Sequence, residues 1–291
     1  MIEKYFISGN FYENAEALRE NNFPTWGMSI KEAGSMRFRW NEVNKNRAGF
    51  LRYLSGDSLS EWSPLNSENS AASNEKKEFK DIAAVELVHS HTVFAVNSIE
   101  ELNEKQGDGI ITKNRSLIPV VTVADCMPIF LFEKKSGVFG VLHSGWKGTG
   151  IVKDAIEKAE KVYGAKRENF CVVMGPHIHD CCYTVDEERA SYFRVNFGND
   201  CVTPLQNDIL GRTGQGERLR EKRFSLSLAK ANLNILREMG VHENNIVVCR
   251  DCTCCNSMFG SFRRETFGLP SDMSLEEKQK HFTVQAAWVK W

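Results

Sequence analysis

The sequence predicts an α+β fold, a layered sandwich of mixed β-sheets flanked by helices. Short apolar runs with β-character recur along the chain, amphipathic helical patterns separate some of them, and one pair of runs is joined by a hairpin signal. This mixture fits an α+β class better than a doubly wound parallel sheet, in which a helix follows each strand.

The predicted strands are short and rich in β-branched and aromatic residues. They are Val85–Val88, Ile118–Ala124, Ile129–Glu133, Val138–Leu142, Phe170–Met174 and Ile246–Cys249. Two amphipathic helices are expected as well. The first presents one apolar face made of Val152, Ala155, Ile156, Ala159 and Val162. The second presents Leu226, Ala229, Leu233, Leu236 and Met239, with Ser225 as its N-cap and Gly240 at its end.

The composition indicates a single globular domain over residues 1–291. Of its 291 residues 42% are hydrophobic and 26% charged, which suffices for a buried core and excludes a disordered or fibrous chain. Polar stretches at about residues 55–81 and 206–223 are expected to be surface loops. A formal net charge of −1 gives no general attraction to nucleic acid or to an anionic membrane, so neither is expected as a partner. No expectation follows for the oligomeric state.

The N-terminal segment, MIEKYFISGN, lacks a basic stretch followed by an apolar run, and no apolar run is long enough to span a bilayer. We therefore expect a cytoplasmic protein. Nine cysteines, an odd number in uneven clusters, favour free thiols or metal ligands over a disulfide framework.

The segment VVTVADCMPIFLFEKKSGVFGVLHSGWKGTG carries the strongest chemical signal. Its KKSG connection predicts a hairpin, which brings Cys126 close to His143. A thiol beside an imidazole is compatible with a zinc site, a Cys/His nucleophilic pair, or a buried thiol next to a satisfied core histidine. His89 follows the strand-like VELV and, if it reaches the same place, completes a His, His, Cys set. Such a set leaves the fourth position of zinc open, as in catalytic sites.

Several residues near this set are candidates for binding an anion or moving a proton. Ser144 and Lys147 lie in HSGWKGTG, which leads into a predicted helix N-terminus suited to phosphate, although a plain glycine turn is the alternative. Arg263 and Arg264 follow MFGSF, and their guanidinium groups suit phosphate, although surface ion pairing is commoner. Asp125 is a candidate to orient a histidine or accept a proton, with a turn or cap role as the alternative.

Two further segments combine histidines and cysteines. GPHIHDCCY supplies His177, His179, Cys181 and Cys182, and DCTCC supplies Cys252, Cys254 and Cys255. Together they could form a closed structural zinc site. Adjacent cysteines rarely share one ion, however, which argues against it.

Taken in order, these motifs resemble a known family. They are HS at 89, GDGIIT at 107, ADCMP at 124, HSGWKG at 143, GPHIHDCCY at 175, DCT at 251 and FGSFRRE at 259. In them the chain resembles the laccase-domain family, also called multicopper polyphenol oxidoreductase or peptidoglycan editing factor, from Val85 to about Phe267. The resemblance implies a zinc ion held by His89, Cys126 and His143. It also implies an enzyme that phosphorolyses purine nucleosides and deaminates adenosine.

The resemblance extends to an Asn-Arg pair, Asn46 and Arg47, and makes Arg47 a further candidate for phosphate binding. The chain departs from the family at three positions. Leu87 stands where a glutamine is usual, Lys147 where an arginine is usual, and Trp26 where an N-terminal arginine is expected. If that arginine holds phosphate or the nucleoside, its replacement affects the range of substrates or phosphorolysis itself.

The seven histidines are too few for a blue-copper site plus a trinuclear copper centre, so zinc is preferred to copper and a multicopper oxidase is rejected. The leading hypothesis is a zinc-dependent enzyme acting on purine nucleosides and phosphate. It would phosphorolyse adenosine, inosine or methylthioadenosine to the base and ribose 1-phosphate and deaminate adenosine to inosine, with Asp125 and Cys126 in catalytic roles. Two alternatives stay open: a hydrolase with Cys126 as nucleophile and His143 as base, and a non-enzymatic editing factor in cell-wall precursor synthesis.

Overall fold

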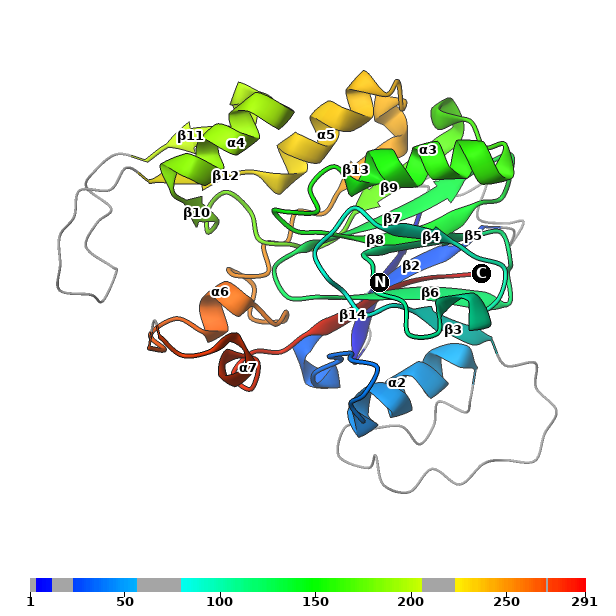
Figure 1. Ribbon diagram of the computed structural model, residues 1–291, viewed down its shortest axis with the longest axis horizontal. Coiled ribbons are helices and arrows are strands. Elements are labelled where there is room, and N and C mark those ends of the chain that lie inside the picture. The colour runs from blue at the N-terminus through cyan, green and yellow to red at the C-terminus, as the bar shows by residue number, and fades with distance from the viewer. Residues whose placement is uncertain (1–3, 12–22, 57–79, 206–222, 271) are drawn as a thin grey trace.

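The computed structural model describes residues 4–11, 23–56, 80–205, 223–270 and 272–291 (Figure 1). Most of the two stretches predicted as polar loops, at about 55–81 and 206–223, lies outside the described residues.

The strands and helices follow one another in a mixed order. The strands are β1 Phe6–Asn10, β2 Thr25–Ser29, β3 Asp81–Ala84, β4 Val93–Ala95, β5 Gly109–Thr112, β6 Leu117–Val123, β7 Met127–Glu133, β8 Phe139–Ser144, β9 Phe170–Met174, β10 Thr184–Val185, β11 Val202–Pro204, β12 Phe224–Leu226, β13 Ile246–Val248 and β14 Gln285–Lys290. The helices are α2 Lys45–Ser55, α3 Ile151–Tyr163, α4 Glu187–Phe197, α5 Leu228–Glu238, α6 Phe262–Glu265 and α7 Leu275–Lys278.

Two large sheets stack face to face, with α3 and α5 above one sheet and α2 below the other (Figure 1). The upper sheet has the order β13-β9-β7-β8-β5-β4 and the lower sheet β1-β2-β14-β6-β3. Both contain parallel and antiparallel pairs. A third, small sheet has the order β10-β12-β11. The predicted fold class, a layered α+β sandwich of mixed sheets, is confirmed.

Strand β7 shows why the sequence builds these layers. Successive side chains of a strand point to opposite faces. Ile129 and Leu131 pack in the core under α3 and α5, while Phe130 and Phe132 pack in the core between the two sheets. All four are at most 1% exposed, so the continuous apolar run reflects a strand buried on both faces.

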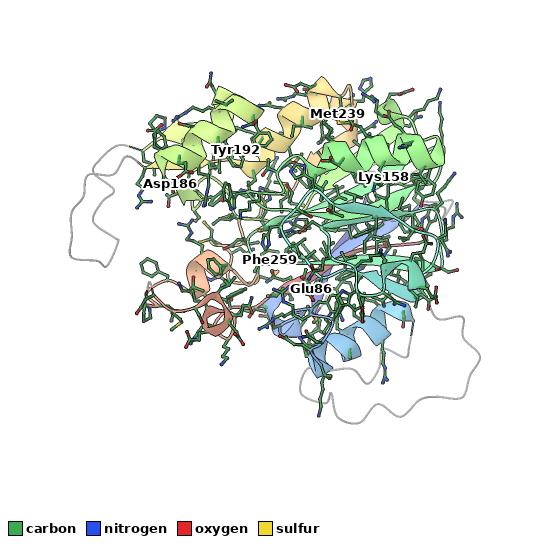
Figure 2. The ribbon with its side chains drawn as sticks, viewed as in Figure 1. Glu86, Lys158, Asp186, Tyr192, Met239 and Phe259 are labelled. Atoms are coloured by element: carbon green, nitrogen blue, oxygen red, sulfur yellow. The ribbon has the colours of Figure 1, made fainter. Side chains whose placement is uncertain are left out.

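The helices seal the outer faces of the sheets. Val152, Ala155, Ile156 and Ala159 of α3 are buried as predicted, but Val162 is 53% exposed. Lys158, on the same helix, donates from its Nζ to the carbonyl of Val93 at 2.6 Å (Figure 2). The apolar stem of a lysine can thus cover the edge of the sheet while its ammonium group binds the backbone of β4.

The N-cap predicted for the second helix was wrong by two residues. Ser227, not Ser225, caps α5 by accepting a hydrogen bond from the amide of Lys230. Ser225 and Leu226 belong to β12, where Ser225 is paired with Thr184 and Thr203. Pairing in the small sheet delays the start of the helix.

The first predicted strand was also displaced. Strand β3 ends at Ala84, so the whole predicted run Val85–Val88 lies beyond it, and Val88 is 44% exposed. The chain there leaves the lower sheet and crosses to β4 in the upper sheet. Likewise, β6 belongs to the lower sheet and β7 to the upper one, so the turn between them is a second crossing. His89 and Cys126 lie in these two crossings.

Candidate metal centre

A buried carboxylate, Asp108, organises the first crossing. Its two oxygens accept hydrogen bonds from the amide of His89 at 2.9 Å and from the amide and hydroxyl of Ser90 at 2.6 and 2.7 Å. His89 has a φ of +58°, a left-handed conformation that costs a non-glycine residue about 1 kcal/mol. The hydrogen bonds to Asp108 offset that strain and fix where the His89 side chain begins.

The same carboxylate holds His143, at the end of β8. The Nδ1 atom of His143 lies 2.9 Å from Asp108 Oδ1, and the amide of His143 donates to the Asp108 carbonyl at 2.7 Å. His143 is 2% exposed and Asp108 is fully buried. With Nδ1 engaged, Nε2 is the nitrogen left to bind a metal, an arrangement common around metal-binding histidines.

Cys126 reaches the two histidines because the predicted hairpin forms. Strands β7 and β8 pair with Pro128 opposite His143 and Met127 opposite Ser144. A β-carbon added to Gly145 would lie 2.8 Å from the Cys126 sulfur, closer than atoms pack, so only glycine leaves room for the thiol.

The ligand atoms of His89, Cys126 and His143 all lie within 4.8 Å of one another. The two imidazole rings meet nearly at right angles, at 87°, with centroids 4.9 Å apart. Two nitrogens and one sulfur gathered this closely fit a zinc-type ion, with a fourth position left for water or substrate. The structure thus brings the three predicted ligands together, and metal binding by them stays a prediction.

Charge within this group favours the thiolate of Cys126, the form of cysteine that binds metal. Burial by itself would raise the pKa of the Cys126 thiol, but His143 and His89 outweigh it and lower that pKa to about 6. Burial would lower the pKa of His143, but Cys126 and Asp108 raise it to about 10. In the metal-free protein at neutral pH, Cys126 is therefore a thiolate facing a protonated His143.

These residues lie at a pocket of about 460 Å³, a size suited to small molecules. Its apolar and aromatic lining includes Phe38, Leu87, Trp146, Ile178, Tyr183, Phe262 and Phe282. Four arginines also line it, namely Arg37, Arg39, Arg189 and Arg263. A flat apolar ring and an anion can therefore both be bound next to the three ligands.

Two of these arginines are best placed for an anion. Arg37 pairs with Glu42 and Arg39 with Glu86, which neutralises them. Within the described part of the chain, Arg189 and Arg263 have no carboxylate partner. Arg189 lies over the Trp146 ring, 4.3 Å from its centroid, and its buried Nε has no hydrogen-bond partner. Arg263 donates to the hydroxyl and the carbonyl of Thr184.

The other predicted anion-binding residues lie outside the pocket lining. Arg47 stacks on Phe38, and burial lowers its pKa to about 10. Ser144 is buried and bonded to Gly148 and Asn232. Lys147 lines a second hollow beside α4, which shares Trp146 and Arg189 with the pocket. Asp186 and Tyr192, labelled in Figure 2, also line this second hollow.

Arg264, the last of the predicted anion-binding residues, stabilises the loop of residues 253–259. Its guanidinium donates to the carbonyls of Thr253, Cys254, Asn256 and Phe259. A guanidinium with its donors used in this way has few left for phosphate.

Asp125 lines the pocket but does not orient a histidine. Its carboxylate accepts from the hydroxyls of Thr253 and Ser261 at 2.7 and 3.0 Å and from the amide of Arg263 at 2.6 Å. Its φ of +73° turns the chain from the lower sheet into the upper one. The orienting role expected of Asp125 belongs to Asp108, because Asp108 is the carboxylate bonded to His143.

Comparison with known proteins decides the family. Residues 64–269 match the family described as multi-copper polyphenol oxidoreductase laccase, over more than half of the chain. The chain belongs to this laccase family. It is 39% identical over 189 residues to a purine nucleoside phosphorylase of Clostridium acetobutylicum, covering 64% of this chain and 72% of that protein. It is also 31% identical over 162 residues to adenosine deaminase RL5 from an unknown prokaryotic organism, covering 54% and 56% of the two chains.

Two solved structures share the fold. The Bacillus licheniformis hypothetical protein YfiH matches with a TM-score of 0.68 at 18% identity, over 92% of each chain. YlmD from Geobacillus stearothermophilus matches with a TM-score of 0.65 at 21% identity, over 92% of this chain and 91% of that one.

The family description mentions copper, but two of the histidines outside the centre have other partners. His91 Nδ1 pairs with Asp154, and the buried His177 binds the carbonyl of Gly175. Among the described residues, only one group of potential ligands contains histidine, and it holds two. A trinuclear copper centre needs many more.

In the described residues, none of the helices has the length and apolar character needed to cross a membrane.

Sequence reasoning missed Asp108, Arg189 and Tyr183. Asp108 stands between two glycines in a motif that leads into an apolar strand, and a lone acid at such a place is a recognisable sign of a buried partner. Tyr183 ends the motif GPHIHDCCY, which could have indicated it. Arg189 carries no comparable sign, because helix α4 brings it to the pocket.

Proposed function

We propose that this chain is a zinc-dependent enzyme of purine nucleosides, with the metal held by His89, Cys126 and His143. It would phosphorolyse adenosine, inosine or methylthioadenosine and deaminate adenosine to inosine. The supporting observation is the open group of two histidines and one cysteine at a pocket lined by aromatic rings and arginines. The names of its relatives, purine nucleoside phosphorylase and adenosine deaminase, agree with this proposal.

The aromatic lining would bind the nucleoside. Trp146, Tyr183 and Phe262 offer faces on which a purine can stack, an interaction worth about 1–3 kcal/mol per base. Burial raises the pKa of the Tyr183 hydroxyl, so it stays protonated and can donate a hydrogen bond to the substrate. The bound metal would supply a Lewis acid beside the purine or sugar.

Arg189 and Arg263 would bind phosphate for phosphorolysis. A phosphate oxygen attacks the anomeric carbon of the ribose while the bond from that carbon to the purine nitrogen breaks. The base leaves with the bonding electron pair and takes up a proton. Positioning the phosphate in line with that bond is the main contribution that these arginines can make. Asp125 would act through Arg263, since it holds the Arg263 amide.

Deamination uses the same pocket with water in place of phosphate. Water adds to the amino-bearing carbon of the purine and ammonia leaves, which needs a group to move the proton. His89 is a metal ligand in this proposal. Tyr183, which lines the pocket, is the residue that we propose donates a hydrogen bond to the substrate during this step.

A Cys/His hydrolase is the second candidate, and one observation favours it. In the metal-free protein, Cys126, His143 and Asp108 form a thiolate, imidazolium and carboxylate series of the kind used by cysteine nucleophiles. His89 has no place in that series, whereas a metal site requires it. The third candidate, a non-enzymatic editing factor, has no structural observation of its own.

The test is incubation of zinc-loaded protein with adenosine, with and without phosphate, followed by chromatography. Adenine formed only with phosphate supports phosphorolysis, and inosine formed in either case supports deamination. Inosine and methylthioadenosine should be tried with phosphate as well. If no purine nucleoside gives base or deaminated product, the proposal is wrong.

A further inference from the structure

Four cysteines gather at a second place, away from the pocket lining. Cys181 and Cys182 lie in the loop after β9, and Cys252 and Cys255 in the loop after β13. Their sulfur atoms all lie within 4.8 Å of one another. Strands β9 and β13 are parallel neighbours, so the two loops leave the sheet side by side from the carboxyl ends of these strands.

The distances between these sulfurs match a tetrahedral metal site. Cys181 and Cys182 are 3.8 Å apart, Cys181 and Cys255 3.6 Å, and Cys182 and Cys255 3.3 Å. Zinc bonds to sulfur of about 2.3 Å place the corners of a tetrahedron about 3.8 Å apart. A disulfide would need about 2.05 Å, and all four cysteines are free thiols here.

Hydrogen bonds from backbone amides hold the two loops in this arrangement. His177 and Cys252 form an isolated parallel bridge, in which the amide of Thr253 donates to the His177 carbonyl at 3.0 Å. The amide of His179 points at the Cys252 sulfur, 3.4 Å away. A backbone amide aimed at sulfur stabilises a thiolate, the form that binds metal.

The sequence raised one objection to this site, that adjacent cysteines rarely share one ion, and the structure removes it. The sulfurs of the adjacent Cys181 and Cys182 lie 3.8 Å apart, a separation that one ion can bridge. Cys252 and Cys255 have the C-x-x-C spacing common in zinc sites, and the amide of Cys255 donates to the Cys252 carbonyl at 3.1 Å.

We propose that Cys181, Cys182, Cys252 and Cys255 bind one Zn²⁺ in a closed, structural site. With four protein ligands no position is left for water or substrate, so this ion has no direct part in catalysis. Four thiolates around one dication leave a net negative charge. The guanidinium of Arg264, in α6, donates to the carbonyls of Thr253 and Cys254 in the second loop and offsets part of this charge.

The site would stiffen one wall of the pocket. Ile178 and Tyr183 flank the first pair of cysteines and line the pocket, and Thr253 lies between the second pair and binds Asp125. A metal ion joining the two loops would fix all three residues. This inference does not depend on the proposed function, because it concerns metal content and loop order.

Metal analysis of purified protein, freed of loosely bound ions, tests the proposal. The wild-type protein should hold two zinc ions per chain. Cys126→Ala, which leaves the cluster intact, should hold one, and Cys126→Ala combined with Cys255→Ser should hold none. The matched control is Cys254→Ser, because Cys254 is the neighbour of Cys255 but is not among the four. It should keep both ions.

A spectroscopic measurement separates the cluster from adventitious binding. In Cys126→Ala protein reconstituted with cobalt, four thiolate ligands should give strong sulfur-to-cobalt charge-transfer bands and the visible bands of a tetrahedral ion. The proposal is overturned if Cys126→Ala protein retains no zinc, if the retained metal is not zinc, or if mass mapping without reductant finds a Cys182–Cys255 disulfide. Because Cys126 lies outside the cluster, these outcomes are decisive even if Cys255→Ser does not fold.

Discussion

The molecule has two sulfur-containing centres that differ in almost every respect. The first joins one cysteine to two histidines, is backed by the buried carboxylate of Asp108, and lies at the pocket. The second consists of four cysteines, is held by backbone hydrogen bonds, and is away from the pocket lining. Three protein ligands leave a metal able to bind substrate, and four do not. The difference suggests that one centre carries the chemistry and the other holds its surroundings.

The two centres also differ in the pKa of their thiols. Neighbouring histidines lower the pKa of Cys126 to about 6 against the effect of burial. In the cluster, burial and then the hydrogen bond with Cys255 raise the pKa of Cys181 to about 12. The first centre therefore holds a thiolate before a cation arrives. In the second centre Cys181 needs the cation to ionise it, whereas burial raises the pKa of Cys252 but hydrogen bonds from backbone amides, led by that of His179, outweigh burial and lower it.

The largest effect is expected from His89→Ala. Removing one of three ligands should release the metal from the first centre and lower kcat/KM for adenosine by about a thousandfold, as several kcal/mol of Lewis-acid stabilisation is lost. The matched control is His91→Ala, two residues away, whose exposed ring pairs with Asp154. Steady-state kinetics and metal analysis measure both variants. A His89→Ala protein that keeps full activity would point to the Cys126/His143 hydrolase, which does not need His89.

The next effect is expected from Asp108→Asn. The amide keeps the size of the carboxylate but weakens its hold on both His143 and the backbone of His89. Loss of such a supporting group lowers metal affinity by about 10–100-fold, which competition with a chelator can measure. Asp154→Asn serves as the control, since Asp154 holds His91 outside the centre. Equal affinity in Asp108→Asn and wild-type protein would show that the buried carboxylate is not part of the metal centre.

The sequence predicted one centre better than the other, and the reason lies in chain connectivity. Cys126 and His143 are joined by one hairpin, so local rules bring them together. His89 depends on a crossing between sheets, and only the family resemblance indicated it. The cysteine cluster unites loops about 70 residues apart in the chain, whose meeting follows from the parallel pairing of β9 and β13. Sequence patterns do not specify which strands become neighbours.

The anion-binding residues show the same limit. Lys147 and Arg47 stand in motifs, but the fold directs Lys147 to another hollow and Arg47 onto Phe38. Arg189 stands in no motif, and helix α4 brings it to the pocket. Trp26 stands where the family resemblance leads us to expect an arginine. Its ring stacks on that of Phe130 between the sheets, with the ring centroids 5.0 Å apart, and Trp26 does not line the pocket. Its replacement of an arginine is accommodated by core packing.

Arg189→Gln tests this revised assignment and should have a smaller effect than the changes at the metal centre. Loss of a charged hydrogen bond, about 1.5–3 kcal/mol, should raise the KM for phosphate by about 10–100-fold. Deamination, which uses no phosphate, should change much less. Lys147→Gln should leave the KM for phosphate nearly unchanged, because Lys147 lies outside the pocket lining. If the two variants exchanged these effects, the glycine-rich turn would be the phosphate site after all.

The smallest effect is expected when the pH is changed. The measurement is the rate at which iodoacetamide alkylates each cysteine of the metal-free protein. With a pKa of about 6, Cys126 is mostly thiolate at pH 7 and half thiolate at pH 6, so its alkylation should slow only about twofold across that interval and level off above it. Cys181, with a pKa near 12, should instead react about tenfold faster with each unit of pH between 7 and 9. Peptide mass spectrometry distinguishes the two cysteines in one sample. A Cys126 rate that also rose tenfold per unit would mean that its thiol is not ionised by the histidines, and the contrast between the two centres would then rest on ligand number alone.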